Sequence, residues 1–490
     1  MNYRLLCKVL GLLVLLMAGS LLLCELYGFF VDTPGSGTRG NDIALLKSFV
    51  FALVLGIALV WVGKNSGREI LRKEAIAIVG LGWLLCTAVG ALPYILCSPS
   101  LNPAAAFFES ASGFTTTGST AIADLNLYPR SILLWRATTQ WLGGMGILVL
   151  FVALLSSLGV GSKALFRHES SAQIGQGFHS RIRQTALGLW LLYTALTVIC
   201  IAGLVVLGMS FYDAILHAFA AISTGGFSSR NESLMFYQNP GMEIWLCIFM
   251  FLGGANFLLL VRVLRRDIAG IRKEEEFRAY AAIILIATAV IALDLILRQG
   301  APIAKSLLAS AFQVISITTT TGFVSADFDL WPNLSQAVLV LLMFIGGCSG
   351  STAGGIKVGR VLVFFKTTGQ QLINSFRPNQ VVPVRLNGNI LREPQKAAAL
   401  FFIALTGVFV GAGTLLITLL EPDISLVSSF TSVTATLFNI GPGLDAVGAT
   451  KTFAFFSPAS HLLLAFLMLL GRLEFFALLV LFLPALWRRY

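Results

Sequence analysis

The chain contains few charged residues. Only 12% of its 490 residues are Asp, Glu, Lys or Arg, whereas 57% are hydrophobic. A soluble protein would have too little charge to cover its surface, so this composition excludes an ordinary soluble globular protein. What is present instead is a series of apolar runs of roughly 20 residues, each long enough to cross a bilayer as a helix. The predicted fold class is an all-α polytopic membrane protein, because lipid offers no hydrogen-bond partner to unpaired backbone groups.

The sequence also lacks the patterns of metal, redox and nucleotide sites. It has four histidines and no HExxH motif, and its seven cysteines lie in or beside apolar runs without CxxC spacing. Such cysteines are typical of buried small hydrophobic residues rather than of disulfides or zinc ligands. The glycine-rich stretch at 346–355 fails as a Walker A loop, because Ile356 separates Gly355 from Lys357. We therefore expect neither an enzyme nor an organic cofactor.

Ten hydrophobic spans can be drawn, as a two-helix leader followed by four repeats. The spans are 5–27, 43–63, 74–97, 131–157, 185–208, 241–263, 278–298, 334–365, 397–420 and 457–486. The predicted divisions are a leader at 1–70, repeat 1 at 71–160, repeat 2 at 184–268, repeat 3 at 276–370 with a broken second span, and repeat 4 at 396–490. Each repeat is expected to consist of a span, a short half-helix, a polar filter strand and a second span, and the four repeats are expected to surround one pore.

A short polar motif ending in glycine recurs once in each repeat, between two apolar runs. The four copies are Thr116-Thr117-Gly118, Thr224-Gly225-Gly226, Thr320-Thr321-Gly322 and Asn439-Ile440-Gly441. Outer hairpin loops that use glycine for turns would explain a single copy. They do not explain the shared placement of all four, which favours a common function.

Four such segments can assemble one ring of backbone carbonyls. A ring of this kind replaces the hydration shell of a monovalent cation inside a membrane. Glycine permits backbone conformations in which the carbonyls point inward, and Thr and Asn add oxygens of their own. The motif contains no carboxylate, which argues against a filter for divalent cations. The repeat therefore predicts a pore for a monovalent cation.

A short half-helix is expected before each motif, with its negative C-terminal end directed toward the pore. Its predicted N-cap or first turn lies at Asn102-Pro103, Asp213, Pro302 and Pro422-Asp423. Nine residues before each closing glycine stands a polar residue, and we expect these side chains to support the half-helices or the filter by hydrogen bonds. They are Glu109, His217, Gln313 and Ser432. Chance polarity near a wet pore is the alternative. It explains Ser432 equally well, whereas a membrane carboxylate such as Glu109 is costly without a partner.

Basic residues are distributed unevenly between the loops. With both termini in the cytoplasm, 25 of the 34 Lys and Arg residues fall on the cytoplasmic side and eight on the outer side. This bias predicts cytoplasmic termini and filters that open outward. The net charge of +11 is spread over short loops without aromatic platforms, so nucleic-acid binding is not expected. The loops at 163–183, 262–278 and 357–396 are candidates for contact with a cytoplasmic protein. The second contains Lys273-Glu274-Glu275-Glu276, which suits protein contact or a solvated loop.

A glycine-rich stretch interrupts the eighth span. It contains Gly346, Gly347, Gly350, Gly354 and Gly355, and none of its ten residues has a large side chain. Irregular backbone at membrane depth is tolerated only where it is buried or lines a cavity. A flexible loop that closes the pore is one interpretation, and a GxxxG-type helix-packing surface is the other.

Arg472 is a second candidate for a gate. It falls about halfway along the last span, where a charge is costly unless it faces the pore or a partner. Glu474 would point in a different direction on a helix, so the two side chains are not expected to pair. A cation beside a cation pathway would raise a local barrier. An ion pair with a carboxylate of another repeat explains Arg472 equally well.

The chain resembles the Trk/Ktr/HKT superfamily of potassium transporters, most closely the TrkH/TrkG-type pore subunits. The resemblance covers nearly the whole chain and includes the two-helix leader. It rests on SGFTTTGS at 112–119, ISTGGFS at 222–228, TTTTGF at 318–323, FNIGPG at 438–443, the glycine-rich interruption at 346–355 and GRLEFF at 471–476. The fourth motif departs most, with Asn439-Ile440 in place of Thr-Thr, as is usual in the superfamily.

The resemblance implies several further properties. Glycine at all four closing positions implies K⁺ as the transported ion, because a serine in the first repeat is associated with sodium transport in this superfamily. It also implies a gate at 346–355 and Arg472, a homodimer, cytoplasmic TrkA-type nucleotide-binding regulatory subunits, and a place in the bacterial inner membrane. Coupling to protons or sodium, as in a symport, is left open.

Two other functions compete with this interpretation. The potassium-binding subunit of a Kdp-type pump also uses four such repeats, but GRLEFF and the glycine-rich stretch favour the Trk type. A polytopic membrane enzyme would need catalytic groups clustered at one membrane depth, whereas the few acidic residues lie mostly in loops.

Overall fold

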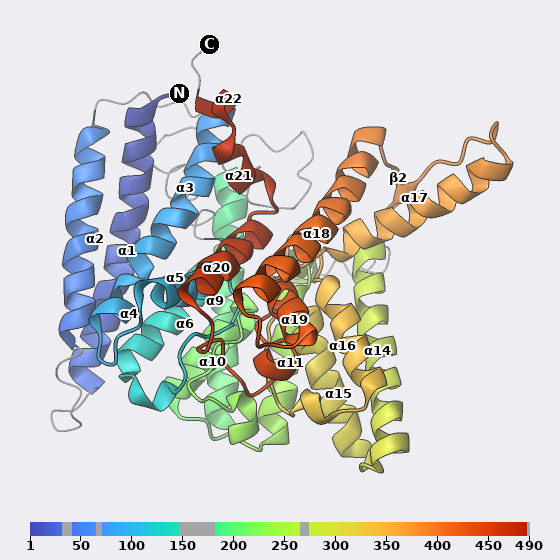
Figure 1. The fold of residues 1–490 in the computed structure, drawn as a ribbon, viewed down its shortest axis with the longest axis horizontal. Coiled ribbons are helices and arrows are strands. Elements are labelled where there is room, and N and C mark those ends of the chain that lie inside the picture. The colour runs from blue at the N-terminus through green and yellow to red at the C-terminus, as the bar shows by residue number, and fades with distance from the viewer. Residues whose placement is uncertain (32–41, 65–70, 147–181, 265–273, 488–490) are drawn as a thin grey trace.

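The computed structural model describes residues 1–31, 42–64, 71–146, 182–264 and 274–487 (Figure 1). Within these ranges the chain is helical apart from loops and a single two-stranded hairpin. Six described helices are long and apolar enough to cross a membrane, or up to eight if each of two bent pairs is one span. Of the ten expected spans, 131–157 runs beyond the described residues, and 334–365 is broken as predicted. The predicted all-α polytopic class is confirmed.

The two leader helices cross closely at glycine. α1 (Tyr3–Val31) and α2 (Asp42–Val62) lie along each other at one side of the molecule (Figure 1). A Cβ added to Gly11 would lie 2.8 Å from the carbonyl oxygen of Gly56, and one on Gly63 would lie 2.5 Å from the Cβ of Lys8. Small residues allow helix backbones to approach in this way inside a membrane. α1 therefore holds α2 against the bundle, where α1 contacts α3 and α6.

The remaining chain repeats one order of elements four times, here called units 1 to 4. The first helices are α3 (Arg72–Gly90) with its extension α4 (Leu92–Leu96), α9 (Ile182–Val206), α14 (Glu275–Gln299) and α18 (Glu393–Leu420). The half-helices are α5 (Pro103–Phe114), α10 (Phe211–Ser223), α15 (Ile303–Thr318) and α19 (Leu426–Leu437). The connections from the half-helices to the second helices contain η1 (Leu125–Leu127), η2 (Ser233–Phe236), η3 (Phe328–Leu330) and η4 (Asp445–Val447). The second helices begin as α6 (Arg130–Gly144), α11 (Pro240–Gly254), α16 (Asn333–Phe344) and α20 (Pro458–Arg472).

Side-chain caps begin three of the half-helices. Asn102 accepts a hydrogen bond from the Ala105 N–H, as expected, and α15 begins directly after Pro302. Ser210 caps α10, which leaves Asp213 in the first turn. The prediction of Pro422-Asp423 for α19 was wrong, because the hydroxyl of Ser425 accepts from the Ser428 N–H and sets a later start.

The second helix of units 2, 3 and 4 is interrupted. α11 turns by 109° into α12 (Phe257–Leu264), and α20 turns by 116° into the segment that begins with α21 (Phe476–Leu479). α16 is separated by a loop from α17 (Val358–Phe376), and α6 ends at Gly144. The spans 241–263 and 457–486, which we expected to be continuous, are therefore bent.

Glycine at these breaks lets the second helix touch the end of the half-helix. A Cβ on Gly143 would lie 1.9 Å from the carbonyl oxygen of Phe114, the last residue of α5. One on Gly471 would lie 1.7 Å from the carbonyl oxygen of Leu437, the last residue of α19. No side chain fits between these backbones.

The third unit extends furthest from the bundle. α17 leads to the antiparallel strands β1 (Arg385–Leu386) and β2 (Asn389–Ile390), and α18 returns along it (Figure 1). Asn387 and Gly388 between the strands both have positive φ, as a two-residue hairpin turn requires. The terminal helix α22 (Pro484–Trp487) lies at the same end of the molecule as the N-terminus (Figure 1).

The crossing of α1 and α2 leaves no room for a side chain at Gly11. We expect Gly11→Ile to destabilise the protein by about 1–3 kcal/mol, because the added side chain overpacks the α1–α2 contact. The midpoint of thermal unfolding in detergent measures this. Gly19→Ile on the same helix is the control, since Gly19 is exposed and no atom lies within 4 Å of an added Cβ. Equal midpoints for the two variants would contradict the prediction.

Candidate ion filter and gate

The four motif segments, here called the filter, share one backbone conformation. The φ values of their first residues are left-handed: Thr116 55°, Thr224 54°, Thr320 56° and Asn439 57°. The closing glycines also have positive φ: Gly118 88°, Gly226 76°, Gly322 79° and Gly441 108°. A change of hand at successive residues turns successive carbonyls to the same side, as a carbonyl-lined pore needs. A β-branched residue such as Thr rarely adopts a left-handed φ, and strain of this kind is typical of functional sites.

Each closing glycine faces the middle residue of the next unit. An added Cβ would lie 2.3 Å from the carbonyl oxygen of Gly225 at Gly118, 1.9 Å from that of Thr321 at Gly226, 1.9 Å from that of Ile440 at Gly322, and 2.9 Å from that of Thr117 at Gly441. The contacts run from unit 1 to 2, 2 to 3, 3 to 4 and back to 1. The four segments therefore form one closed ring.

The half-helices hold the ring in place. In every unit the N–H of the middle filter residue donates to a carbonyl five residues earlier in the half-helix, with the same N···O distance. The four bonds are Thr117 to Ser112, Gly225 to Ala220, Thr321 to Ser316 and Ile440 to Ala435, each 2.8 Å long. The C-terminal end of each half-helix is thereby joined to the filter, where its dipole favours a cation.

Side chains of unit 4 and unit 1 brace the ring where it closes. The Asn439 amide donates to the Thr117 hydroxyl at 2.9 Å and to the Met468 carbonyl at 3.0 Å. The Ser119 hydroxyl donates to the Gly441 carbonyl at 2.8 Å. The asparagine that distinguishes the fourth motif therefore bonds both a neighbouring filter strand and the second helix of its own unit.

Gln140 supports the second filter segment, and the sequence analysis missed it. Its amide donates to the Gly225 carbonyl at 2.6 Å and accepts from the Phe227 N–H at 3.1 Å. A Cβ on Gly225 would lie 2.4 Å from the Gln140 amide carbon. This explains why unit 2 has glycine in the middle position, where the other units have a side chain. Gln140 is fully buried, and its only signal in the sequence was an amide side chain within the predicted span 131–157.

Glu109 binds the segment that follows the first filter segment. Its carboxylate accepts from the Thr120 hydroxyl at 3.1 Å and from the Ala121 N–H at 2.8 Å, just beyond the filter. It also pairs with Arg136 at 2.5 Å, and both side chains are buried. The Arg136 guanidinium lies 3.4 Å from the centre of the Phe227 ring and donates to the Ser228 carbonyl. This pair joins the residues that follow the first two filter segments.

The other three polar residues that stand nine positions before a closing glycine make different contacts. His217 binds the Asp213 carbonyl at 2.7 Å and the Ser228 hydroxyl at 3.0 Å, so it connects α10 to the segment after the filter. Ser432 donates to the Ser429 carbonyl of its own half-helix and not to the filter. Gln313 is buried and has no hydrogen-bond partner among the described residues, so the expected bond is not found there.

A small cavity lies at the glycine end of the ring. Its volume is about 70 Å³, and all four closing glycines line it together with residues of the connections that follow the filter segments. Arg230 and Lys451 are among those residues. The glycine end of the filter therefore opens to this cavity, and the first residues of the motifs lie at the opposite end.

The glycine-rich stretch, here called the gate loop (residues 346–355), contacts that opposite end. The Gly354 N–H donates to the Thr320 hydroxyl at 2.7 Å, and the Thr352 and Thr224 hydroxyls are 3.2 Å apart. The loop also occupies the break in the second unit, where the Cys348 N–H donates to the Gly254 carbonyl at 2.8 Å. A Cβ on Gly354 would lie 2.3 Å from the Phe438 carbonyl oxygen, so the loop needs its small residues.

Arg472 lies at the end of α20, where the helix turns, rather than within a continuous span. Its guanidinium donates to the Thr352 carbonyl of the gate loop at 2.7 Å and to the carbonyls of Gly143 and Gly144 at 2.6 and 2.9 Å. Glu474 pairs instead with Arg360 of α17. Arg472 and Glu474 therefore bind different groups, as expected, and Arg472 joins the gate loop to the C-terminal end of α6.

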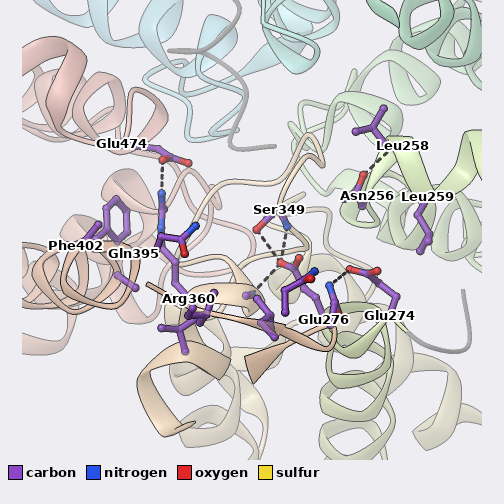
Figure 2. Close-up of a pocket in the computed structure, with 18 of the residues that line it drawn as sticks. Asn256, Leu258, Leu259, Glu274, Glu276, Ser349, Arg360, Gln395, Phe402 and Glu474 are labelled. Atoms are coloured by element: carbon purple, nitrogen blue, oxygen red, sulfur yellow. Dashed lines mark hydrogen bonds and ion pairs between the residues drawn. The ribbon is translucent and has the colours of Figure 1, made fainter. Parts of the chain in front are cut away.

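A larger cavity of about 710 Å³ lies on the side of the gate loop (Figure 2). Glu274, Glu276 and Glu474 line it, together with Arg262 and Arg360. Figure 2 shows the Glu474–Arg360 pair on one side and the Ser349–Glu276 contact on the other. The lining of this cavity therefore combines carboxylates with guanidinium groups.

The chemistry of these groups suits a monovalent cation in transit. The ring offers carbonyl and hydroxyl oxygens without a carboxylate, and the residues that follow are held by hydrogen bonds to neighbouring units. Among the described residues, no group of three His, Cys, Asp or Glu side chains is placed to hold a metal ion. All seven cysteines are free thiols, as the sequence predicted.

Comparison with known proteins agrees with this geometry. A sequence model of the TrkH family, described as a cation transport protein, matches residues 42–489. The chain is 38% identical over 493 residues to the Trk system potassium uptake protein TrkH of Salmonella typhimurium, with full coverage of both. It is 30% identical over 444 residues to TrkG of Escherichia coli, covering 90% of this chain and 91% of that one. The crystal structure of the potassium transporter TrkH from Vibrio parahaemolyticus matches with a TM-score of 0.87 at 30% identity, covering 100% of each chain. The chain therefore belongs to the TrkH family of cation transport proteins, which are transporters rather than enzymes.

Proposed function

We propose that this protein is the pore subunit of a bacterial potassium-uptake system and conducts K⁺ inward through the filter. The observation that carries this proposal is the closed ring of four glycine-to-carbonyl contacts. The relatives at 37–38% identity are named potassium uptake proteins. The match over the full length of those relatives favours this function over a Kdp-type pump subunit or a membrane enzyme.

The ring selects K⁺ by offering oxygens in place of water. Its glycines keep the four segments close, and its carbonyl and threonine oxygens carry partial rather than full charges, which suits an ion of low charge density. Glycine stands at all four closing positions, so no side chain narrows the ring in any unit.

The gate loop and Arg472 close the pathway between the filter and the larger cavity, which lies on the cytoplasmic side. The loop binds the inner end of the filter through Gly354 and Thr352. Arg472 adds a positive charge at the same depth, where the low dielectric strengthens its repulsion of a passing cation. Conduction therefore requires the loop to leave Thr320 and Arg472 to release Thr352.

The protein lies in the bacterial inner membrane with both termini in the cytoplasm, so that the small cavity opens outward. It forms a homodimer that binds cytoplasmic TrkA-type nucleotide-binding subunits. Of the basic segments suited to docking, 163–183 lies outside the described residues and 262–278 lies partly outside them. The segment 357–396 comprises α17 and the β1–β2 hairpin, which extend away from the bundle (Figure 1).

Potassium uptake is the direct test of the function. We expect the protein to restore growth at low K⁺ in a strain that lacks potassium transporters. Gly118→Ser should lower the preference for K⁺ over Na⁺ by about tenfold or more, equivalent to about 1.4 kcal/mol, because the added Cβ meets the Gly225 carbonyl. Gly208→Ser is the control, since Gly208 also has a positive φ but no atom lies within 4 Å of an added Cβ. Full rescue by Gly118→Ser with K⁺ preference intact would overturn the filter assignment.

The Gln140→Leu variant tests whether a side chain of unit 1 that binds the second filter segment affects the preference for K⁺ over Na⁺. Gln140→Leu leaves the Gly225 carbonyl and the Phe227 N–H without their partner, at a cost of about 1–3 kcal/mol. We expect a weaker K⁺ preference in flux assays together with a lower unfolding midpoint. Gln336→Leu is the matched control, because Gln336 binds the Asp329 and Trp331 carbonyls, away from the filter. If both variants lost stability and neither lost selectivity, Gln140 would have no role in ion choice.

Ion flux through purified protein in liposomes tests the gate. We expect both deletion of residues 349–351 and the Arg472→Ala substitution to raise K⁺ flux in the absence of any other subunit. The deletion shortens the gate loop, and the substitution removes the positive charge that lies against it. Arg377→Ala, at the exposed end of α17, should leave flux unchanged. Unaltered flux in both gate variants, with selectivity retained, would show that neither group closes the pore.

A further inference from the structure

We infer that Glu276 is a positioning residue that holds the gate loop closed, and that Glu274 and Glu275 connect it to the cytoplasmic hairpin. The three glutamates, here called the latch, stand together at the N-terminal end of α14. This inference rests on the proposed gate and adds the group that positions it. The sequence allowed these residues to form a solvated loop, but Glu276 is only 7% exposed.

One carboxylate oxygen of Glu276 joins the two sides of the interruption in unit 3. It accepts from the Ser349 N–H at 2.7 Å, from the Ser349 hydroxyl at 2.9 Å and from the Gly359 N–H at 2.9 Å. Ser349 belongs to the gate loop, and Gly359 is in the first turn of α17. Hydrogen bonds to an ionised carboxylate are roughly twice as strong as neutral ones, and the start of a helix favours a negative charge.

These contacts fix the part of the gate loop that the filter does not hold. Thr352 and Gly354 bind filter hydroxyls at the far end of the loop, and Ser349 binds Glu276 at the near end. Because the loop is attached at both ends, it cannot leave the filter as a unit while the carboxylate keeps Ser349. Release of Ser349 is therefore a step that opening requires.

The other two glutamates tie the same helix end to the hairpin. The Asn387 side chain, in the hairpin turn, donates to Glu274 at 2.5 Å and accepts from the Glu275 N–H at 2.7 Å. Lys366 of α17 pairs with Glu275 and also donates to the Arg385 carbonyl at 2.8 Å. The hairpin, α17 and the gate loop thus all bind one helix turn.

Charge makes this arrangement sensitive to movement of the hairpin. Three adjacent carboxylates repel one another, and Lys366, Asn387 and the backbone N–H groups offset that repulsion. Displacing the hairpin withdraws Asn387 from Glu274 and Glu275 and takes away the Arg385 carbonyl that holds Lys366, which leaves Glu276 as the next carboxylate to rearrange. Glu276 and Ser349 lie at the wall of the inner cavity, where there is room for such a change (Figure 2).

Flux through the full-length protein in liposomes, with no other subunit present, tests the latch. Glu276→Gln keeps the shape of the side chain but not its charge, and we expect about a tenfold increase in basal K⁺ flux with K⁺ preference unchanged. Asn387→Ala should raise flux in the same direction but less. Glu393→Gln is the matched control, because Glu393 also begins a first helix but is exposed and contacts no part of the gate loop.

The outcomes separate the latch from the gate. Unchanged flux in Glu276→Gln, while deletion of 349–351 raises it, would overturn the latch and leave the gate. No increase in either variant would overturn the gate, and the latch with it. Lower flux with a lower unfolding midpoint would show that Glu276 only caps the start of α17, which also overturns the latch. Should Glu276→Gln fail to fold, Ser349→Ala removes one of the three bonds and leaves the carboxylate; a rise in flux supports the latch, and no rise overturns it.

Discussion

Backbone contact between each closing glycine and the carbonyl of the next unit is the constraint on which the structure depends. Four such contacts close a ring, so a shift in one unit must be taken up by the other three. Every filter segment is bonded to its half-helix with the same 2.8 Å hydrogen bond, so the ring also sets where each half-helix ends. The second helices in turn touch those ends through glycine. The filter contacts therefore set the positions of the half-helices, and the half-helices set the positions of the second helices that touch them.

Hydrogen bonds between units keep this strained ring in one conformation. Left-handed threonines are costly, and such strain persists only where the surroundings over-determine it. Here the partner usually comes from a different unit: Gln140 binds the second segment from the first unit, and Asn439 binds the first from the fourth. The buried Glu109–Arg136 pair is costly to desolvate, but removing either member would leave a charge unpaired. These bonds therefore favour one arrangement of the ring more than they add overall stability.

The features that could be predicted from the sequence are those that depend on a short stretch of neighbouring residues. The filter, the half-helices and the broken eighth span follow from motif, length and glycine content. The bends in 241–263 and 457–486 did not follow, because a glycine pair within an apolar run is equally typical of straight packed helices; its meaning depends on the half-helix it touches. Gln140 was missed for the same reason. Gln313 was grouped with Glu109 and His217 because each stands nine residues before a closing glycine. That spacing gives no information about a hydrogen-bond partner, and the bond expected for Gln313 was not found.

In the proposed gate, the loop and Arg472 compete with the ion for the same kind of oxygen. Arg472 binds the Thr352 carbonyl, and Lys357 binds the next carbonyl, that of Ala353. Two consecutive carbonyls beneath the filter are thus occupied by the protein's own cations. Thr352 also contacts Thr224 of the filter through its hydroxyl, so one residue connects the charge, the loop and the ring. A movement that withdraws Thr352 from the filter therefore also disturbs Arg472, so that in the proposed gate the steric and the electrostatic parts of the barrier are removed together.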